Sequence, residues 1–435
     1  MGNDQRGRGS PQPKGSVFHN KWLMAVLLSA GLALDYQARV AINSVFPMLR
    51  RELGMTDIQI GLTATLFLWS YALLSPLAGY IGDRFPRRTV LIISVAAWNV
   101  VTILSGFATS AWQLIAIRML LASLQVCYMP TALAFITDFH DDKTQGKGIG
   151  IFQTGVYVGI FLAGFPAAYV ATHLGWRAMF FLSGGIGLFC AGLMFALPGG
   201  GKENVRGKEP GSSHPARTSL GDAIAVFRTP SILSIMLAFA LFGGASWIVL
   251  TYLPLLIYEH YHVSLELAAF QATFYMQVAG IVAEPILGHV SDRWSAYNVK
   301  NRFYFCALTG LAGLPALMAI GLGRHRGVLI AGLAVFGMVC AAYDVSFMPM
   351  LTYVTSKYQR ATAYGYLNLA SCLSGGAAAM VAALMMKTLG LSFVVASSGG
   401  LFLLVFLVLI VTARVTLPRD ILMQSVGKGN HVSNN

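Results

Sequence analysis

Long apolar stretches alternate with short polar ones along this chain from residue 22 to residue 415. Each apolar stretch holds about 20 residues or more, which is the length of α-helix that crosses the hydrocarbon core of a bilayer. The pattern therefore predicts an all-α membrane protein with twelve transmembrane helices. The expected helices are 22–49, 58–81, 89–109, 112–137, 147–171 and 177–197 in a first set, and 231–257, 266–290, 303–322, 327–353, 361–386 and 391–415 in a second set.

A polar segment separates the two sets of helices, and Gly, Pro, Ser and charged residues dominate it. This composition is typical of a flexible linker. The sequence therefore predicts two six-helix bundles that are joined on the cytoplasmic side. The expected parts are a disordered N-terminal tail at 1–21, a first bundle at 22–197, the linker at 198–230, a second bundle at 231–415 and a C-terminal tail at 416–435.

The composition supports this class of protein. Hydrophobic residues make up 56% of the chain and charged residues 11%, whereas soluble domains average about 25% charged residues. The five cysteines lie in apolar stretches without CxxC spacing, so we expect buried thiols and neither disulfides nor a zinc site. The chain also lacks a phosphate-binding loop and a catalytic triad. We expect no metal, no cofactor and no enzymatic activity.

The net charge of +13 would also suit a nucleic-acid-binding protein, but the basic residues gather in alternate loops. If the N-terminus is cytoplasmic, 22 Lys and Arg residues face the cytoplasm and 6 face the opposite side. Such an asymmetry sets the orientation of membrane proteins. The sequence therefore predicts that both termini are cytoplasmic, and that the basic residues serve topology and not nucleic-acid binding.

A local motif repeats at the end of the second and of the eighth expected helix. In both places a glycine precedes an Asp–Arg pair by four residues. A repeat at equivalent positions predicts pseudo-symmetric bundles with a site between them. We expect the glycine to allow close helix packing, and the charges to bridge neighbouring helix ends; a loop that is merely basic is the alternative. The motif residues are Gly79, Asp83, Arg84, Arg87 and Arg88, and Gly288, Asp292 and Arg293.

The first expected helix carries two opposite charges, Asp35 and Arg39, one turn apart. A charge near the middle of a bilayer costs at least ~2.5–3.5 kcal/mol, so such side chains face a partner or a wet cavity. A guanidinium there can bind a carboxylate or a phosphate with two hydrogen bonds. The alternative is an ion pair between Asp35 and Arg39 themselves. Asp35 is a candidate proton or cation carrier, with a structural partner of Arg39 as its alternative.

Three further charges lie inside expected helices. Arg118 precedes Gln125 by two helical turns, so both occupy one face; it is either a second cation on the path or a structural partner of an acid. Glu284 and Asp344 are the other intramembrane acids, and we take both as candidates for coupling transport to an ion. For Glu284 the alternative is an ion pair at the end of its helix, near the repeated motif.

The repeated loop, the linker and the twelve helices resemble the major facilitator superfamily, with Pro86 where its signature usually has Gly. Within it, Tyr36-Gln-Ala-Arg39 is similar to the Tyr-x-Asp-Arg of the anion:cation symporter family. Further similar segments are Trp69-Ser-Tyr71, Arg118 with Gln125 and Pro130-Thr131, Trp247 to Pro254, and Leu367-Asn368. The resemblance implies that Arg39 binds a substrate carboxylate, and we expect Tyr36, Tyr71, Gln125 and Asn368 beside it.

Two departures from that family concern proton coupling. Ala38 stands where the family has an Asp, and Gln125 where it has a Glu. The usual proton carriers are thus absent, and either the role has moved, with Asp35, Arg118, Glu284 and Asp344 as the candidates, or transport is not proton-coupled in the family's way. Organophosphate:phosphate antiporters, which also have Tyr-x-x-Arg in the first helix, are a second family to compare, and Spinster-like lipid transporters, whose Asp-Arg pair in that helix is absent here, are a third.

These observations together predict a secondary active transporter in a bacterial inner membrane. We expect a monomer that moves a small organic anion, such as a sugar acid, by alternating access. An exporter of amphipathic drugs or lipids with the same fold is the alternative. A membrane sensor that binds without transport is a third hypothesis.

Overall fold

The computed structural model describes residues 21–140, 144–196, 229–355 and 360–421. Regular structure within these ranges is helical throughout, and twelve helical stretches are long and apolar enough to cross a membrane. The predicted all-α class and the twelve spans are therefore confirmed. Most of the predicted linker and both predicted tails lie outside the described residues, although helix continues to Ile421 and thus into the expected C-terminal tail.

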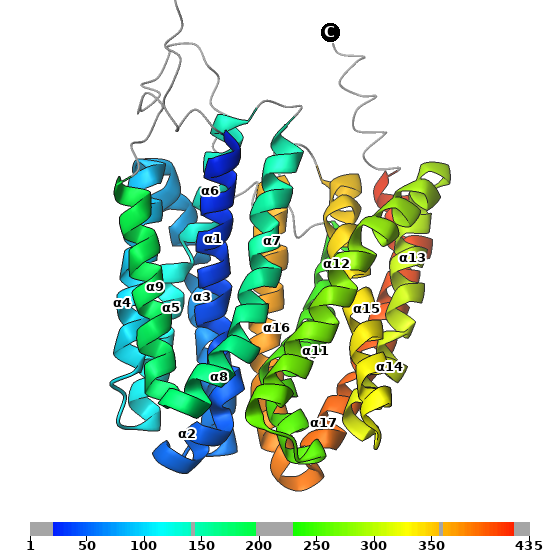
Figure 1. Ribbon diagram of the computed structural model, residues 1–435. Helices are drawn as coiled ribbons and strands as arrows, with labels where there is room; N and C mark the ends of the chain where they lie inside the picture. Colours follow the sequence, from blue (N-terminus) through cyan, green and yellow to red (C-terminus); the bar gives the residue numbers. More distant parts are fainter. Residues whose placement is uncertain (1–20, 141–143, 197–228, 356–359, 422–435) are drawn as a thin grey trace, which may run out of the picture.

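The first half of the chain forms one bundle (Figure 1). Its elements are α1 (Lys21–Val40), the 3-10 helix η2 (Ala41–Val45), α2 (Phe46–Leu53), α3 (Asp57–Arg84), α4 (Arg87–Ser105), α5 (Ala111–Gln125), α6 (Tyr128–Phe139), α7 (Gln145–Ala163), α8 (Phe165–Leu174) and α9 (Trp176–Ala196).

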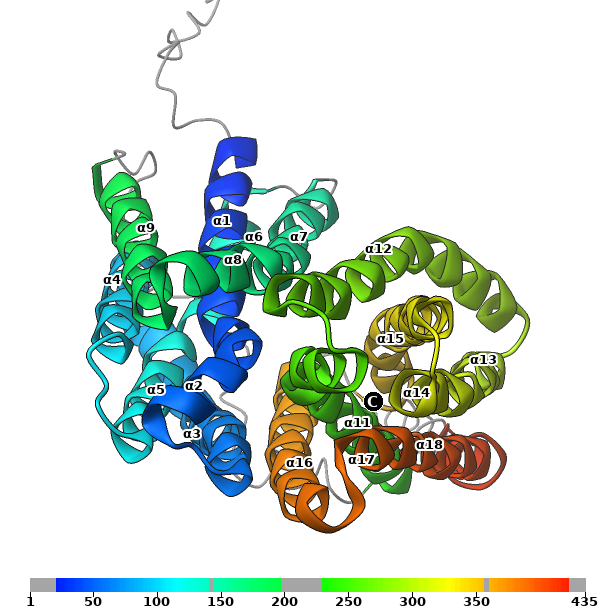
Figure 2. The same ribbon diagram turned by 60° about the horizontal axis from the view of Figure 1, so that its bottom comes forward.

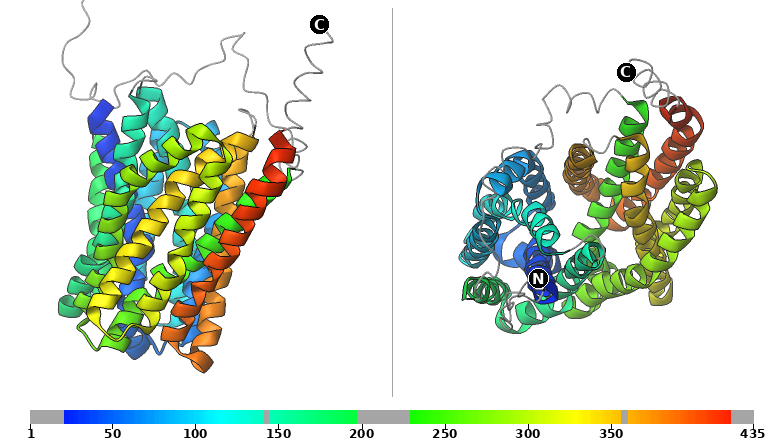
Figure 3. Two further views of the ribbon diagram at one scale, coloured as in Figure 1. Left: turned by 90° about the vertical axis from the view of Figure 1, so that its right-hand side faces the viewer. Right: turned by 90° about the horizontal axis from the view of Figure 1, so that it is seen from above.

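The second half forms the other bundle, which lies beside the first (Figures 1 and 3). Its elements are α11 (Pro230–Tyr261), α12 (Leu265–Tyr297), α13 (Lys300–Leu311), α14 (Gly313–Leu322), α15 (Arg326–Val354), α16 (Arg360–Leu389), α17 (Leu391–Ser398), α18 (Gly400–Val411) and the π-helix η4 (Thr412–Thr416). The halves meet along α3 with α16 and along α7 and α8 with α12.

Several expected helices are interrupted in the structure. The expected helix 22–49 passes through the 3-10 helix η2 after Val40. The expected helix 147–171 is divided at Gly164 into α7 and α8, and Pro166 lies in the first turn of α8, where a missing N–H costs nothing. A Cβ on Gly164 would lie 2.1 Å from Thr273 Oγ1 of α12. The interruption therefore also lets the two halves approach closely.

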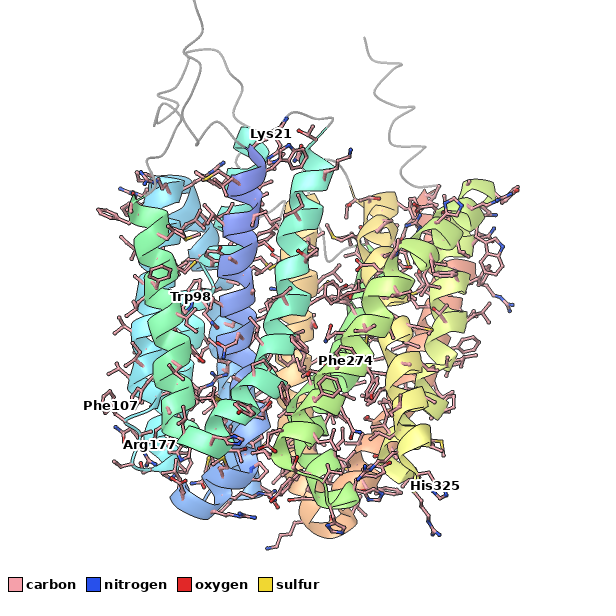
Figure 4. All side chains as sticks on the ribbon, viewed as in Figure 1. Lys21, Trp98, Phe107, Arg177, Phe274 and His325 are labelled. Atoms are coloured by element: carbon pink, nitrogen blue, oxygen red, sulfur yellow. The ribbon has the colours of Figure 1, made fainter. Side chains whose placement is uncertain are left out.

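The two ends of the molecule differ in how the halves meet. Lys21 lies at the upper end in Figure 4, and Phe107, Arg177 and His325 lie at the lower end. Figure 2 turns this lower end forward and shows α2 on the first half and α17 on the second. At the lower end Arg50 Nη1 pairs with Glu259 Oε1 at 2.6 Å, across the two halves. A single hydrophobic cluster also contains buried residues of both halves. The bundles are thus closed against each other at the lower end.

Candidate functional site

The charged centre of the first half is an ion pair within α1. Arg39 Nη2 donates to Asp35 Oδ2 at 3.0 Å, and the two side chains are 7% and 4% exposed. Their spacing of four residues places them on one face of the helix, as expected. In this state of the protein the intrahelical pair is formed, and it uses one terminal nitrogen of Arg39.

Aromatic rings surround the Arg39 guanidinium. Its Cζ lies 4.8 Å from the ring centroid of Tyr36, 4.7 Å from that of Tyr71 and 5.5 Å from that of Phe67. Guanidinium groups are attracted to ring faces at such distances, and more strongly where water is excluded. The predicted residues Tyr36 and Tyr71 therefore do lie beside Arg39, from α1 and α3. Phe67 was not among the predicted site residues.

Arg118 of α5 holds the main chain of α1. Its Nη1 donates to the carbonyl of Ala38 at 2.7 Å, and its Nη2 donates to the carbonyl of Arg39 at 2.5 Å. Its Cζ also lies 4.7 Å from the ring of Phe67, so that this ring is shared between the two guanidinium groups. The acid that we considered as its partner is thus replaced by two carbonyls at the end of a helix, where a cation is favourable.

Gln125 completes the cluster, because its Nε2 donates to the carbonyl of Asp35 at 3.0 Å. Four buried polar atoms of this centre have no hydrogen-bond partner in the described part of the chain: Asp35 Oδ1, Arg39 Nε, Arg118 Nε and Gln125 Oε1. Buried polar groups are nearly always paired, and unpaired ones call for an explanation. The centre also holds two guanidinium groups against one carboxylate. The excess positive charge and the two unpaired guanidinium nitrogens favour an anion, whereas the unpaired oxygens of Asp35 and Gln125 favour a hydrogen-bond donor or a proton.

The second half contributes α16 to this region. Cys372 is buried in the same hydrophobic cluster as Phe67 and Tyr71, and its Sγ lies 3.9 Å from Asn368 Oδ1, one turn away. Asn368, a predicted ligand, thus has this contact within its own helix, and its place beside Arg39 stays a prediction. All five cysteines are free thiols, as expected; Cys306 and Cys372 are buried and the other three are half-buried.

Two of the predicted coupling acids, Glu284 and Asp344, lie elsewhere, on α12 and α15. Tyr157 of α7 donates its hydroxyl to Glu284 Oε2 at 2.5 Å, which joins the two halves. Asp344 interacts electrostatically with Glu284. The alternative for Glu284, an ion pair at its own helix end, is absent from the described residues. The structure therefore separates two charged places: the arginine centre in the first half and a carboxylate pair in the second, with Tyr157 between the halves.

Comparison with known proteins identifies the family to which this architecture belongs. The family model of the Major Facilitator Superfamily matches residues 28–323, more than half of the chain. The chain belongs to the major facilitator superfamily. It is similar to a probable sulfoacetate transporter of Cupriavidus necator, with 26% identity over 79% of this chain and 82% of that protein. A probable L-galactonate transporter of Escherichia coli is 23% identical over 72% of this chain and 71% of that protein.

A solved structure of the superfamily has the same fold. It is a bacterial homolog of the human lysosomal transporter Spinster in an inward-facing and unoccupied conformation. The TM-score is 0.79 and the identity 18%, over 93% of this chain and 99% of that one. The two-bundle architecture predicted from the sequence is thus found in a solved superfamily member, and proteins of this family are transporters, not enzymes.

The signature loop of the superfamily makes contacts with main-chain carbonyls. Arg87 Nη1 donates to the carbonyl of Ala134 on α6 at 2.9 Å, and Arg88 Nη2 to that of Phe195 on α9 at 3.1 Å. Arg84 ends α3, where Gly79 and Asp83 also lie. The side chain of Asp83 is outside the described part, so its expected bridge stays a prediction.

In the second half the Asp of the repeated motif bridges to a neighbouring helix end, as expected, whereas the glycine of the motif does not pack as expected. Asp292 pairs with Arg302 of α13, whereas Arg293 is exposed. A Cβ on Gly288 would lie 3.7 Å from Val345, an ordinary contact. Close packing is therefore the wrong reason for this glycine. Arg302 was missed because it lies at the start of the next helix, outside the motif, and only the fold brings it to Asp292.

Proposed function

We propose that this protein is a secondary active transporter of a small organic anion, such as the carboxylate of a sugar acid, and that Arg39 binds the anion. The observation that carries the proposal is the unbalanced centre of the first half. Two buried guanidinium groups there face one carboxylate, within a membrane-spanning bundle. An anion would neutralise this charge and would supply partners to the unpaired guanidinium nitrogens.

The arrangement also indicates how binding is linked to Asp35. An anion that takes Arg39 with two hydrogen bonds replaces Asp35 as its partner. Asp35 is then released beside the unpaired amide oxygen of Gln125 and becomes free to take up a proton or a cation. Tyr36 and Tyr71 lie at the ring-to-cation distances given above, so their faces hold the guanidinium while the partners exchange.

During the transport cycle the two bundles close against each other alternately at the lower end and at the upper end. In the state described here the lower end is closed by Arg50 and Glu259 and by the hydrophobic cluster that spans the halves. We place the upper end on the cytoplasmic side of a bacterial inner membrane, following the distribution of Lys and Arg. The anion centre would then open to the cytoplasm, and rocking of the bundles would open it to the other side.

The test is substitution of Arg39. The protein is reconstituted into liposomes, and uptake of radiolabelled sulfoacetate and of L-galactonate is measured. Arg39→Ala removes a charge-assisted bidentate contact, so the rate at low substrate should fall by about 10- to 100-fold. Arg177→Ala is the matched control, because Arg177 is half-exposed at the lower end and pairs with Glu52. It should leave uptake unchanged.

Unchanged anion uptake by the Arg39→Ala variant would contradict the proposal. The aromatic surroundings of Arg39 keep an exporter of amphipathic compounds as the second candidate function. Dye efflux that is lost in Asp35→Asn, together with no uptake of either anion by the unmodified protein, would select that candidate.

A further inference from the structure

The segment that follows the ion pair is held by bonds from three directions. After Val40 the chain continues as η2, and all five residues of η2 are buried. Arg118 holds the carbonyls just before it. Within η2, Ser44 Oγ donates to the carbonyl of Ala163 at 2.7 Å, in the same half. Asn43 Nδ2 instead donates to the carbonyl of Leu250 at 3.1 Å, in α11 of the other half.

The acceptor of Asn43 is a carbonyl that a proline leaves free. Pro254 lies inside α11, four residues after Leu250. A proline in a helix has no N–H for the carbonyl four residues earlier. Three other prolines, Pro76, Pro285 and Pro349, also lie inside helices. In the described part of the chain, Pro254 is the one whose freed carbonyl receives a hydrogen bond from a side chain of the opposite half.

The bond from Asn43 begins a line of contacts between the halves. Asn43 lies one helical turn beyond Arg39, and the next elements of the first half continue along α11 to the lower end. There Arg50 pairs with Glu259 and Arg51 Nη2 donates to Tyr258 Oη at 3.0 Å. The segment that carries the candidate anion site is therefore continuous with the contacts that close the lower end.

We propose that Asn43 is a positioning residue that links the anion site to closure of the lower end, through the carbonyl that Pro254 leaves free. When the lower end opens, α11 moves away from the first half and this bond breaks. The freed carbonyl of Leu250 then lacks its partner, which favours the closed state. An anion bound at Arg39 displaces η2. This displacement weakens the bond between Asn43 and Leu250 by moving Asn43, and it promotes opening of the lower end.

The test measures the distance between the halves at the lower end. Spin labels are attached at Phe107→Cys in the first half and His325→Cys in the second, both exposed at that end (Figure 4), in a full-length chain whose five native cysteines are replaced. Double electron–electron resonance spectroscopy then gives the populations of molecules with short and with long distances between the two spin labels. Asn43→Ala should raise the ratio of the open to the closed population by about fivefold, as expected for one buried hydrogen bond.

A double-mutant cycle with Pro254→Ala isolates the mechanism. Alanine at position 254 supplies the missing N–H, so the carbonyl of Leu250 keeps a partner within its own helix. In that background Asn43→Ala should shift the populations far less than in the native one. Ser44→Ala is the matched control: it removes a buried hydrogen bond from the same segment, but one within the first half, and should leave the distance distribution unchanged.

Equal shifts by Asn43→Ala in the two backgrounds, or an equal shift by Ser44→Ala, would overturn the proposal. If Asn43→Ala does not fold, Asn43→Leu, which is closer in volume and also lacks the donor, replaces it in the same cycle. The inference rests on the proposed function in assuming that the lower end opens. Because the distances are measured without any anion, a wrong choice of substrate class fails in the uptake assay and leaves this test unaffected.

Discussion

At the scale of single residues, the charges inside the membrane-spanning helices fall into two groups with different partners. Arg39 and Arg118 are held by one carboxylate and by main-chain carbonyls. Glu284 receives a hydrogen bond from Tyr157 and lies near Asp344. Neither acid forms an ion pair within the described residues. A carboxylate without a cation is the kind of group that takes up a proton or a metal cation.

This arrangement leads to a prediction about ion coupling. If the acids of the second half couple transport to protons, Glu284→Gln and Asp344→Asn should abolish the stimulation of uptake by an imposed pH gradient, because neither amide can change charge. Exchange of internal for external anion should persist in both variants, since it needs no net proton movement. The measurement is sulfoacetate uptake into liposomes with and without the gradient.

Glu52→Gln is the matched control, because it also replaces an acid by its amide, at the lower end where Glu52 pairs with Arg177 and away from Glu284 and Asp344. It should keep the full response to the gradient. A full response in both Glu284→Gln and Asp344→Asn would show that the coupling group lies elsewhere, with Asp35 and Arg118 as the remaining candidates.

The sequence predicted part of this residue-scale picture. The spacing of Asp35 and Arg39 gave their ion pair as an alternative to anion binding, because a helix brings residues four apart together. The partners of Arg118 could not be predicted, because main-chain carbonyls leave no mark in the sequence. The bond of Tyr157 to Glu284 spans 127 positions and depends on how the two halves meet.

At the scale of elements, glycines set how closely α1 and α7 approach. A Cβ on Gly155 would lie 2.3 Å from the carbonyl oxygen of Ser29, and one on Gly159 would lie 2.4 Å from that of Ala33. Both neighbours are backbone atoms and cannot rotate away. Small residues at helix interfaces allow this approach in membranes, where the lipid does not drive helices together. The glycines thus hold α7 against the part of α1 that carries Asp35 and Arg39.

Gly159→Ala should therefore separate α7 from α1 and destabilise the protein by about 1–3 kcal/mol, as overpacking does elsewhere. The measurement is the midpoint of thermal unfolding in detergent. Gly150→Ala is the control on the same helix, because a Cβ there would meet nothing within 4 Å. An equal loss of stability in both variants would mean that helix propensity, and not packing against α1, is responsible.

Hydropathy gave the number of spans but not their interruptions. Apolar periodicity continues across η2 and across Gly164, so nothing in the pattern marked a break there. At Gly164 the local cue was the following Phe-Pro, which is typical of a helix start. At η2 the reason is tertiary: Arg118 of α5 donates to the carbonyls of Ala38 and Arg39 just before η2, and Asn43 within η2 donates to the carbonyl of Leu250 in α11.

At the scale of the whole molecule, the two ends of the bundles carry different numbers of basic residues, and this sets a testable orientation. Phe107 and His325 lie at the lower end. If the lower end faces away from the cytoplasm, Phe107→Cys and His325→Cys should react with a membrane-impermeant maleimide added to intact spheroplasts. Tyr297→Cys, at the exposed end of α12 on the other side, should react only after the membrane is opened.

The reverse labelling pattern would contradict the predicted orientation and would place the closed end on the cytoplasmic side. The orientation is a prediction from the count of Lys and Arg, whereas the closure of the lower end could not be predicted from the sequence. A protein that alternates between two states has the same sequence in both, so the sequence does not show which end is closed. Only contacts such as that of Arg50 with Glu259 show which state is formed.

The hydrogen bonds from Arg118 to main-chain carbonyls have a consequence for redesign of the protein. A carbonyl is present at position 38 whatever side chain stands there, so replacing Ala38 leaves the acceptor in place. The side chain of that position can therefore vary without removing the anchor of the helix. Position 38 is next to Arg39, and a library of acidic, neutral and basic residues there would change the charge presented to a solute while the scaffold around it keeps its attachment.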